Sequence, residues 1–202
     1  MIRYTPLSLS LAGVSLLAGG LLASPAMAEP QRYVVDEEHV SIGFLAGHAR
    51  FADVLGLFTE VSGEFVYDAE AHELQSGTAE IAADSVFTGH NGRDGHVRED
   101  DFLAAGAHPV IRFEATDYVA RDARTGTVQG EITIRGVTRP LSLEATINRI
   151  DAHPIGGAET LGASLRGSLR RSEFGMDYAL EGDLVSDRIE LLIEFEAIRE
   201  DG

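Results

Sequence analysis

The chain has 202 residues and contains no cysteine and no lysine. Without cysteine it can form no disulfide bond, so its stability has to come from packing and hydrogen bonds. The same absence excludes a thiol nucleophile and cysteine-ligated metal sites. Because lysine is missing, all 16 basic residues are arginines.

Positive charge is scarce overall. The 33 acidic residues outnumber the 16 basic ones, which gives a formal net charge of −17. An acidic surface repels nucleic acid and anionic lipid surfaces, so neither is expected as a partner. We interpret the charge as a contribution to solubility rather than as an indication of function.

The N-terminal segment has the pattern of a secretory signal peptide. Arg3 supplies a positive start, Leu7 to Ala23 form an apolar run, and Ala26 and Ala28 provide small residues before a cleavage point at Glu29. The apolar run is short for a membrane anchor, and no stable membrane insertion is expected. Residues 1–28 are therefore predicted to be a signal peptide, residues 29–202 a single domain, and the protein periplasmic.

Residues 29–202 are dominated by alternating apolar and polar residues. The alternation is clear over residues 57–67 and over residues 189–197, and it is typical of half-buried antiparallel strands. About eight such segments and one short helix from Asp94 indicate an all-β barrel or sandwich. An eight-stranded barrel encloses either a packed core or one small ligand, and the pattern alone does not distinguish these.

The stretch from Thr88 to Phe102 interrupts the alternation with glycines, histidines and charges. His90 and His96 flank Asp94, but their spacing matches no helical metal-ligand signature, and we predict no metal or other cofactor. Asp94 with His96 could act in acid–base catalysis, although no Gly-x-Ser-x-Gly nucleophile elbow is present. A structural alternative is that Asp94 caps the helix while Arg93 fastens the loop.

A second irregular site follows the predicted strands near the C-terminal end. Arg170 and Arg171 stand beside Phe174 and Met176. These side chains could line a pocket, since methionine adapts to varied apolar ligands, or they could belong to a loop that closes the barrel. The sequence leaves both interpretations open.

Several motifs together resemble the YceI-like family of exported, lipid-binding proteins. They cover nearly all of residues 29–202. The motifs are His39-x-x-Ile42-x-Phe44 with His48, Gly56-x-Phe58 with Gly63, Ser85 and Thr88, Arg93-Asp94-x-His96 with Asp101-Phe102, Pro109-x-Ile111-x-Phe113, Gly130 to Pro140, Arg171-Ser-x-Phe174-Gly175-Met176, and Ser186-Asp187.

This resemblance implies an eight-stranded antiparallel, lipocalin-like barrel with one short helix. It also implies an elongated internal tunnel for an isoprenoid quinone, a polyprenyl lipid or a similar amphiphile, a tendency to form homodimers, and no established catalytic residues. The chain departs from the family pattern at Leu103, where a second aromatic is common, and at Val97, where leucine is expected. These departures concern the shape of the pocket rather than the fold.

We therefore predict a soluble, non-enzymatic protein that holds an isoprenoid-type lipid for transport, storage or sequestration. The alternatives are an envelope stress-response barrel without ligand and an enzyme that acts on a hydrophobic substrate through His96 and Asp94. Strand faces predict the tail-binding residues, and three polar side chains are predicted at the head group. The predicted ligand-binding residues are Phe44, Val54, Phe58, Phe113, Ile132, Ile134, Phe174 and Met176 for the tail, and His48, Arg93 and His96 for the head group.

Overall fold

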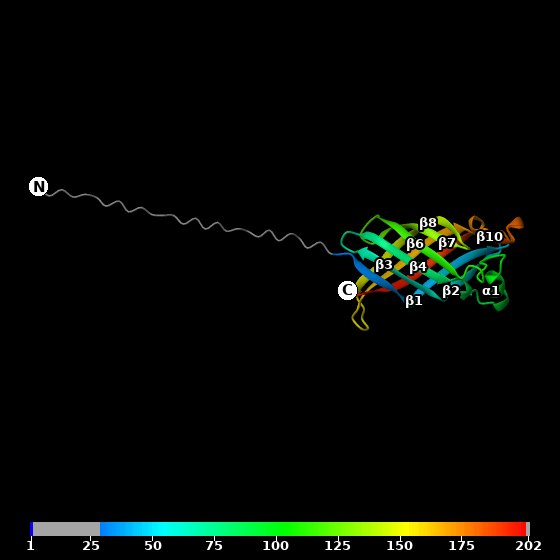
Figure 1. Ribbon diagram of the computed structural model, residues 1–202, viewed down its shortest axis with the longest axis horizontal. Helices are drawn as coiled ribbons and strands as arrows, with labels where there is room; N and C mark the ends of the chain where they lie inside the picture. Colours follow the sequence, from blue (N-terminus) through cyan, green and yellow to red (C-terminus); the bar gives the residue numbers. More distant parts are fainter. Residues whose placement is uncertain (2–28, 201–202) are drawn as a thin grey trace.

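The computed structural model describes Met1 and residues 29–200, and the predicted signal peptide lies outside the described domain. Nearly all of the described chain is strand, drawn as one tightly wound body in Figure 1. The strands are β1 (Gln31–His48), β2 (Ala52–Phe58), β3 (Val61–Asp68), β4 (Glu73–Ala82), β5 (Val86–Phe87), β6 (Val110–Ala120), β7 (Thr125–Ile134), β8 (Val137–Ala152), β9 (Glu159–Arg170) and β10 (Val185–Arg199). The helices are α1 (Asn91–Arg98) and the 3₁₀ turns η1 (Ala83–Ser85), η2 (Arg171–Phe174) and η3 (Glu181–Asp183).

The sheet closes on itself because β10 pairs with β1 in an antiparallel ladder. Ten strand segments make up eight barrel strands. β2 and β3 follow each other along the same side of β1, with Ile42 opposite Phe58 and Val34 opposite Glu64. β4 and β5 continue in the same way along β3 and β2. The predicted eight-stranded antiparallel barrel with one short α-helix is therefore confirmed.

Alternation along the strands separates an apolar interior from a charged exterior. On β10, Ile189, Leu191, Ile193 and Phe195 face inward. The outward positions carry charges that pair across strands, as Glu194 does with Arg166 on β9. Exposed pairs of this kind contribute little to stability individually, so the interior has to supply most of it.

Two glycines make room for large aromatic rings inside the barrel. A Cβ on Gly56 would lie 2.1 Å from the Phe44 ring, and one on Gly130 would lie 2.5 Å from the Phe113 ring. Each ring therefore lies against the bare backbone of the neighbouring strand. Glycine is required at these two positions for close approach and not for its conformational freedom.

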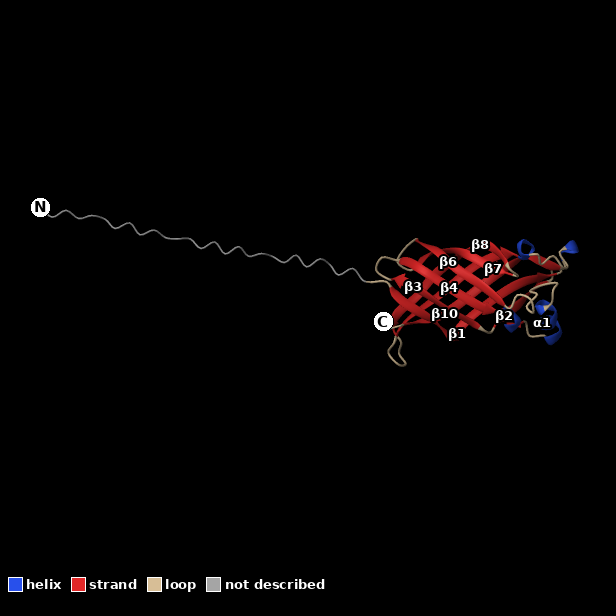
Figure 2. Ribbon diagram, viewed as in Figure 1, coloured by secondary structure: helices blue, strands red, loops and turns tan. Residues whose placement is uncertain are grey.

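The helical elements gather at one end of the barrel, the end to the right in Figure 2. The C-terminus and the start of β1 lie at the other end (Figure 1). That second end is filled by aromatic side chains. Tyr33 is 1% exposed and stacks on Phe65 at 5.3 Å, and Tyr67 meets Tyr118 edge-on at 6.1 Å.

The helix α1 begins differently from the expectation. Its N-cap is His90, whose Nδ1 accepts a hydrogen bond from the Arg93 amide at 3.2 Å. Asp94 is not the cap: it lies inside the first turn, buried, and accepts hydrogen bonds from Thr88. The helix starts three residues earlier than predicted because His90 supplies the capping group. Within residues 29–200, no helix is long and apolar enough to cross a membrane.

Candidate functional site

An elongated cavity of about 270 Å³ runs inside the barrel. It extends from residues beneath α1 to the aromatic side chains near the opposite end. On β10 alone its wall spans Ile189 to Phe195, which is about 20 Å along an extended strand. The residues along its walls are Val35, Val40, Ile42, Phe44, Phe58, Val61, Ser62, Phe65, Leu74, Gly77, Thr78, Ala79, Ile81, Val97, Leu103, Ile111, Phe113, Ala115, Val128, Ile132, Ile134, Leu141, Leu143, Leu165, Leu169, Arg171, Met176, Ile189, Leu191, Ile193 and Phe195.

The lining is almost wholly hydrocarbon and aromatic. Its polar members are Ser62, Thr78 and Arg171, and Arg171 is the charged one. A cavity of this kind attracts apolar molecules, because each buried methylene group stabilises binding by about 0.8 kcal/mol. The volume is slightly below the roughly 300–1,000 Å³ usual for small-molecule pockets, and this favours a slender occupant.

Six of the predicted tail-binding residues border this cavity. Five of them lie on strands, where alternation predicts that they face inward. The sixth, Met176, comes from the loop after η2. The six residues are Phe44, Phe58, Phe113, Ile132, Ile134 and Met176. Their role in binding remains a prediction, but their side chains stand where an internal ligand would lie.

Two other predicted tail-binding residues do not border the cavity. Val54 lies opposite Ala46, one inward position further along the β1–β2 hairpin than Gly56. Neither Val54 nor Ala46 borders the cavity, whereas Phe44 and Phe58, whose rings lie 5.7 Å apart, do. Phe174 is 2% exposed and belongs to the packed core instead, because η2 turns its side chain away from the strand pattern.

None of the three predicted head-group residues borders the cavity. His48 is exposed at the end of β1, beside the three-residue turn that leads to β2. Arg93 is exposed and donates to the Thr88 hydroxyl and carbonyl, each at 2.8 Å. His96 lies outside the cavity wall, where Nε2 is 3.1 Å from an Asp101 oxygen. The clustering of Arg93 and His96 in sequence reflects the fastening of α1 to the barrel.

Arg171 is not among the predicted head-group residues. It is 2% exposed, borders the cavity, and donates to three backbone carbonyls. The acceptors are Ser186 at 2.9 Å, Met176 at 2.5 Å and Val185 at 2.8 Å. Burial lowers the pKa of the guanidinium from its ordinary value, against the opposing effect of Asp187. The sequence indicates this position, because Arg171 belongs to the irregular site near the C-terminal end whose side chains could line a pocket.

A cluster of aromatic rings covers Arg171 on the side of α1. The Phe102 ring centroid lies 5.7 Å from the Arg171 Cζ. Phe102 in turn meets His96 edge-on at 5.1 Å and Tyr178 at 5.5 Å, and His96 lies 5.0 Å from Tyr178. Val97 and Leu103 complete this end of the cavity wall, so the two departures from the family pattern lie where the cavity ends.

The proposed catalytic pair is not arranged around the cavity. The Asp94 carboxylate is held by Thr88, whose hydrogen bonds lower the pKa of Asp94 from its ordinary value. His96 contacts Asp101, Phe102 and Tyr178. Neither side chain borders the internal cavity.

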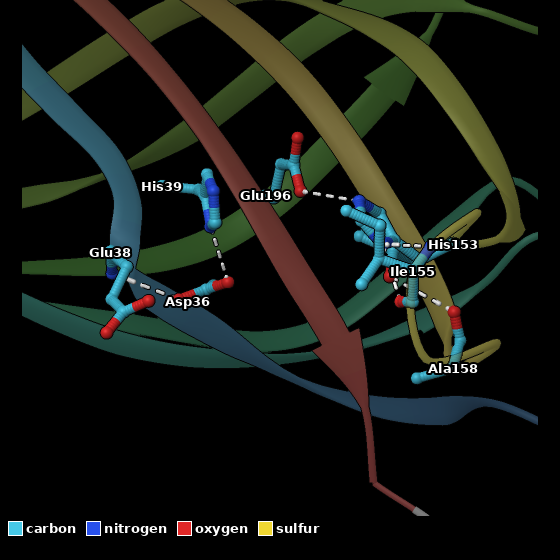
Figure 3. Close-up of polar contacts among 8 residues, drawn as sticks. Asp36, Glu38, His39, His153, Ile155, Ala158 and Glu196 are labelled. Carbon is cyan, nitrogen blue, oxygen red and sulfur yellow. Dashed lines mark hydrogen bonds and ion pairs between the residues drawn. The ribbon is translucent and has the colours of Figure 1, made fainter.

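A second group of titratable side chains lies where β1, β10 and the β8–β9 loop meet (Figure 3). His39 Nδ1 is 2.8 Å from an Asp36 oxygen, and His153 Nε2 is 3.8 Å from a Glu196 oxygen. Hydrogen bonding to Asp36 raises the pKa of His39 and lowers that of Asp36. Across residues 29–200, no three histidine or carboxylate side chains converge closely enough to hold a metal ion.

The fold and the cavity together define a closed eight-stranded barrel around an apolar chamber, the form of a binding protein. The family assignment follows from sequence: the YceI-like domain matches residues 33–197, and the chain belongs to this family. A UPF0312 protein of Pseudomonas savastanoi is 32% identical over 193 residues, covering 94% of this chain and 97% of the relative.

Solved structures give the same fold. The YceI protein of Campylobacter jejuni is 31% identical and superposes with a TM-score of 0.70, covering 77% of this chain and 90% of the other. A polyisoprenoid-binding domain from Saccharophagus degradans is 13% identical with a TM-score of 0.62, covering 83% and 98%. The second likeness shows the shared fold alone.

Proposed function

We propose that the protein is an exported binding protein that holds an isoprenoid-type lipid, such as an isoprenoid quinone or a polyprenyl chain, inside the barrel. The observation that carries this proposal is the cavity, which is elongated, almost wholly apolar and about 270 Å³ in volume. An isoprenoid tail is long, narrow and insoluble in water, so its burial is driven by the hydrophobic effect. The description of the Saccharophagus degradans domain as polyisoprenoid-binding supports the same ligand class.

Binding is favoured over catalysis by the position of the reactive side chains. His96 and Asp94 lie outside the cavity and are engaged by Asp101 and Thr88. The cavity wall itself carries no histidine and no carboxylate. A general acid or base has to reach the atoms that react, so an occupant of this cavity meets no such group from the wall.

The test is to purify the protein from its export compartment without detergent and to identify what comes with it. Native mass spectrometry and solvent extraction are expected to show an isoprenoid-type lipid at up to one molecule per barrel. Delipidated protein is expected to take up a quinone with an isoprenoid tail, measured by quenching of the tyrosine fluorescence. Protein that is free of lipid and takes up neither quinones nor polyprenols would overturn the proposal.

Export to the periplasm is part of the proposal. It is supported by the apolar run from Leu7 to Ala23 and the small residues before Glu29. An aqueous compartment between membranes is where a lipid needs a protein to shield its tail from water. The intact mass of protein from the periplasmic fraction is expected to correspond to a chain that begins at Glu29. A cytoplasmic protein that retains residues 1–28 would contradict it.

A homodimer is also proposed, through an apolar row on the outer surface. Leu57 pairs with Phe87 on one side and with Gly43 on the other, and Gly43 lies opposite Leu192. Phe87 and the neighbouring Leu55 are about half exposed, at 50% and 55%. Apolar surface of this kind marks contacts between proteins. Leu55→Glu is expected to shift a sedimenting dimer to monomer, and a wild-type protein that sediments as a monomer at all concentrations would contradict it.

A further inference from the structure

Arg171 differs from every other charged residue of residues 29–200 in bordering the internal cavity. It is 2% exposed and begins η2, directly after the last residue of β9. The 3₁₀ turn has three residues per turn, so Arg171 shares its buried side with Phe174. A guanidinium is thereby fixed in a wall that is otherwise apolar, at the α1 end of the barrel.

The hydrogen bonds of Arg171 do not use all its donors. A guanidinium carries five N–H groups in a planar fork. Three are directed to the carbonyls of Ser186, Met176 and Val185. Two N–H groups remain, and the Arg171 Cζ lies over the Phe102 ring, 5.7 Å from its centroid. The three carbonyls fix the orientation of the fork, so the remaining donors are held in place rather than free to turn toward water.

The charge of Arg171 also lacks a direct counterion. Among the described residues no carboxylate lies within ion-pair distance of it, whereas many surface arginines have one. Asp187 is the nearest source of opposing charge, but its oxygens accept from the Ser172 amide at 3.0 Å and from Arg170 at 3.2 Å. A buried cation without a counterion is costly unless some acceptor meets it.

From these contacts we infer that Arg171 receives the polar head of the ligand. The head group would be an oxygen acceptor, either a quinone carbonyl or a carboxylate, with the apolar chain running away from α1 toward Phe65 and Phe195. This inference rests on the proposed function and adds to it the chemistry of the head and the direction of the chain. Hydrogen bonds from a charged donor are among the stronger ones, and they select a ligand that has an acceptor.

The first experiment compares ligands that share one tail. The probes are a quinone with a tetraprenyl tail, the tetraprenyl carboxylic acid, and the tetraprenyl hydrocarbon without a head. Wild-type protein is expected to bind at least one headed probe tenfold or more tighter than the hydrocarbon. Arg171→Gln is expected to remove this preference and to leave affinity for the hydrocarbon unchanged, while Arg171→Lys retains part of it.

The matched control is Arg135→Gln. Arg135 lies at the same end of the barrel and donates to the Phe102 carbonyl at 2.6 Å, but it does not border the cavity. It is expected to keep the wild-type preference. Equal binding of headed and headless probes by wild-type protein would overturn the inference, and so would an Arg171→Gln variant that loses affinity for both by the same factor. If no probe binds at all, the proposed function itself fails.

A second experiment needs no variant, since loss of Arg171 could prevent folding. The tetraprenyl quinone or acid, whichever binds tighter, carries a diazirine at the far end of its tail and is photolysed in wild-type protein. Labelled peptides are expected to contain Phe65 or Phe195, and peptides around Leu103 and Met176 are expected to remain unlabelled. Labelling that is concentrated at Leu103 and Met176 would show the reverse orientation and would overturn the inference.

Discussion

The carboxylate of Asp94 holds the loop in front of α1 by accepting two hydrogen bonds from Thr88. The Thr88 amide donates to Oδ1 at 2.7 Å, and the Thr88 hydroxyl donates to the same oxygen. Asp94 is 4% exposed. Arg93 binds the Thr88 hydroxyl and carbonyl from the outer side, so Thr88 is held by two consecutive residues of the helix. These hydrogen bonds between Thr88 and the two helix residues fix α1 over the end of the barrel.

Asp94→Asn is expected to destabilise the protein at neutral pH. The hydrogen bonds from Thr88 lower the pKa of Asp94 below its ordinary value of 3.8, so the ionised form stabilises the fold. That contribution is present above pH 3.8 and is lost as the pH falls through the lowered pKa of the folded state. The urea midpoints of wild type and variant should therefore differ at pH 7 and converge at acid pH. Asp100→Asn, at an exposed position, is the control.

A gap between the Asp94→Asn and wild-type midpoints that stays constant between pH 7 and pH 3 would contradict this account. It would mean that the carboxylate charge is irrelevant to how Asp94 holds Thr88. An unchanged midpoint at pH 7 would contradict it as well, since the neutral amide oxygen of the variant accepts these two hydrogen bonds more weakly than an ionised carboxylate oxygen does.

Gly56→Ala is expected to lower the free energy of unfolding by about 1–3 kcal/mol, the usual cost of overpacking a core. A Cβ at this position would lie 2.1 Å from the Phe44 ring, which has to move into the cavity or displace β2. Gly162→Ala is the matched control, because a Cβ on Gly162 of β9 meets no atom within 4 Å. Urea unfolding of the two variants measures the difference. Equal stabilities would show that Phe44 relocates without cost.

Alternation predicted which face of each strand is internal, but not how far the cavity extends. Phe44 and Phe58 border the cavity, as the period-two alternation of side chains on a strand leads one to expect. Val54 also occupies an inward position, two residues from Gly56, yet it does not border the cavity as Phe44 and Phe58 do. The end of a cavity depends on which rings meet across strands, and this depends on register, which a single strand pattern does not contain.

The α1 end of the cavity was harder to predict for a different reason. Arg170 and Arg171 are adjacent and alike in charge, but Arg170 is exposed and pairs with Asp187 at 3.2 Å, whereas Arg171 turns inward. The strand β9 ends between them, and the 3₁₀ turn η2 replaces period two with period three. The charged cluster from His90 to His96 was more conspicuous in the sequence, but its side chains fasten the helix instead.

Asp36→Asn is expected to lower the pKa of His39. The Asp36 carboxylate accepts from the His39 ring and raises the pKa of His39 above its ordinary value of 6.5, with smaller contributions from Glu196 and Glu38. The pair stabilises the β1 segment above pH 3.8, where Asp36 is ionised, and loses its effect as the pH rises through the raised pKa of His39. An NMR titration of the histidine ring protons measures the pKa of His39 in the wild type and in the variant. Glu37→Gln is the control, and a His39 pKa that is equal in wild type and Asp36→Asn would contradict the assignment.

Tyr67→Phe is expected to make the barrel less sensitive to alkali. Burial raises the pKa of Tyr67 to about 12, from 10.0 in the unfolded chain. A buried neutral tyrosine stabilises the fold fully below pH 10, and this contribution is lost as the pH rises toward the folded-state pKa. The wild-type urea midpoint should therefore fall more steeply between pH 9 and pH 11 than that of the variant. Tyr178→Phe, at a half-exposed site, should follow the wild type, and identical slopes for Tyr67→Phe and wild type would contradict the prediction.

Ala115→Phe is expected to block the cavity without unfolding the barrel. Ala115 borders the cavity from β6 and lies opposite Gly77, which also borders the cavity and carries no side chain. The added ring would occupy space that the lipid tail needs, so uptake of a tetraprenyl quinone should weaken at least tenfold, a loss of about 1.4 kcal/mol in binding free energy. Glu114→Phe places the same side chain on the outer face of the same strand, where the Glu114 side chain is 55% exposed, and should leave uptake unchanged. Both variants should keep a cooperative urea transition. A folded Ala115→Phe protein that takes up the quinone as wild type does would show that the tail lies elsewhere than in this cavity.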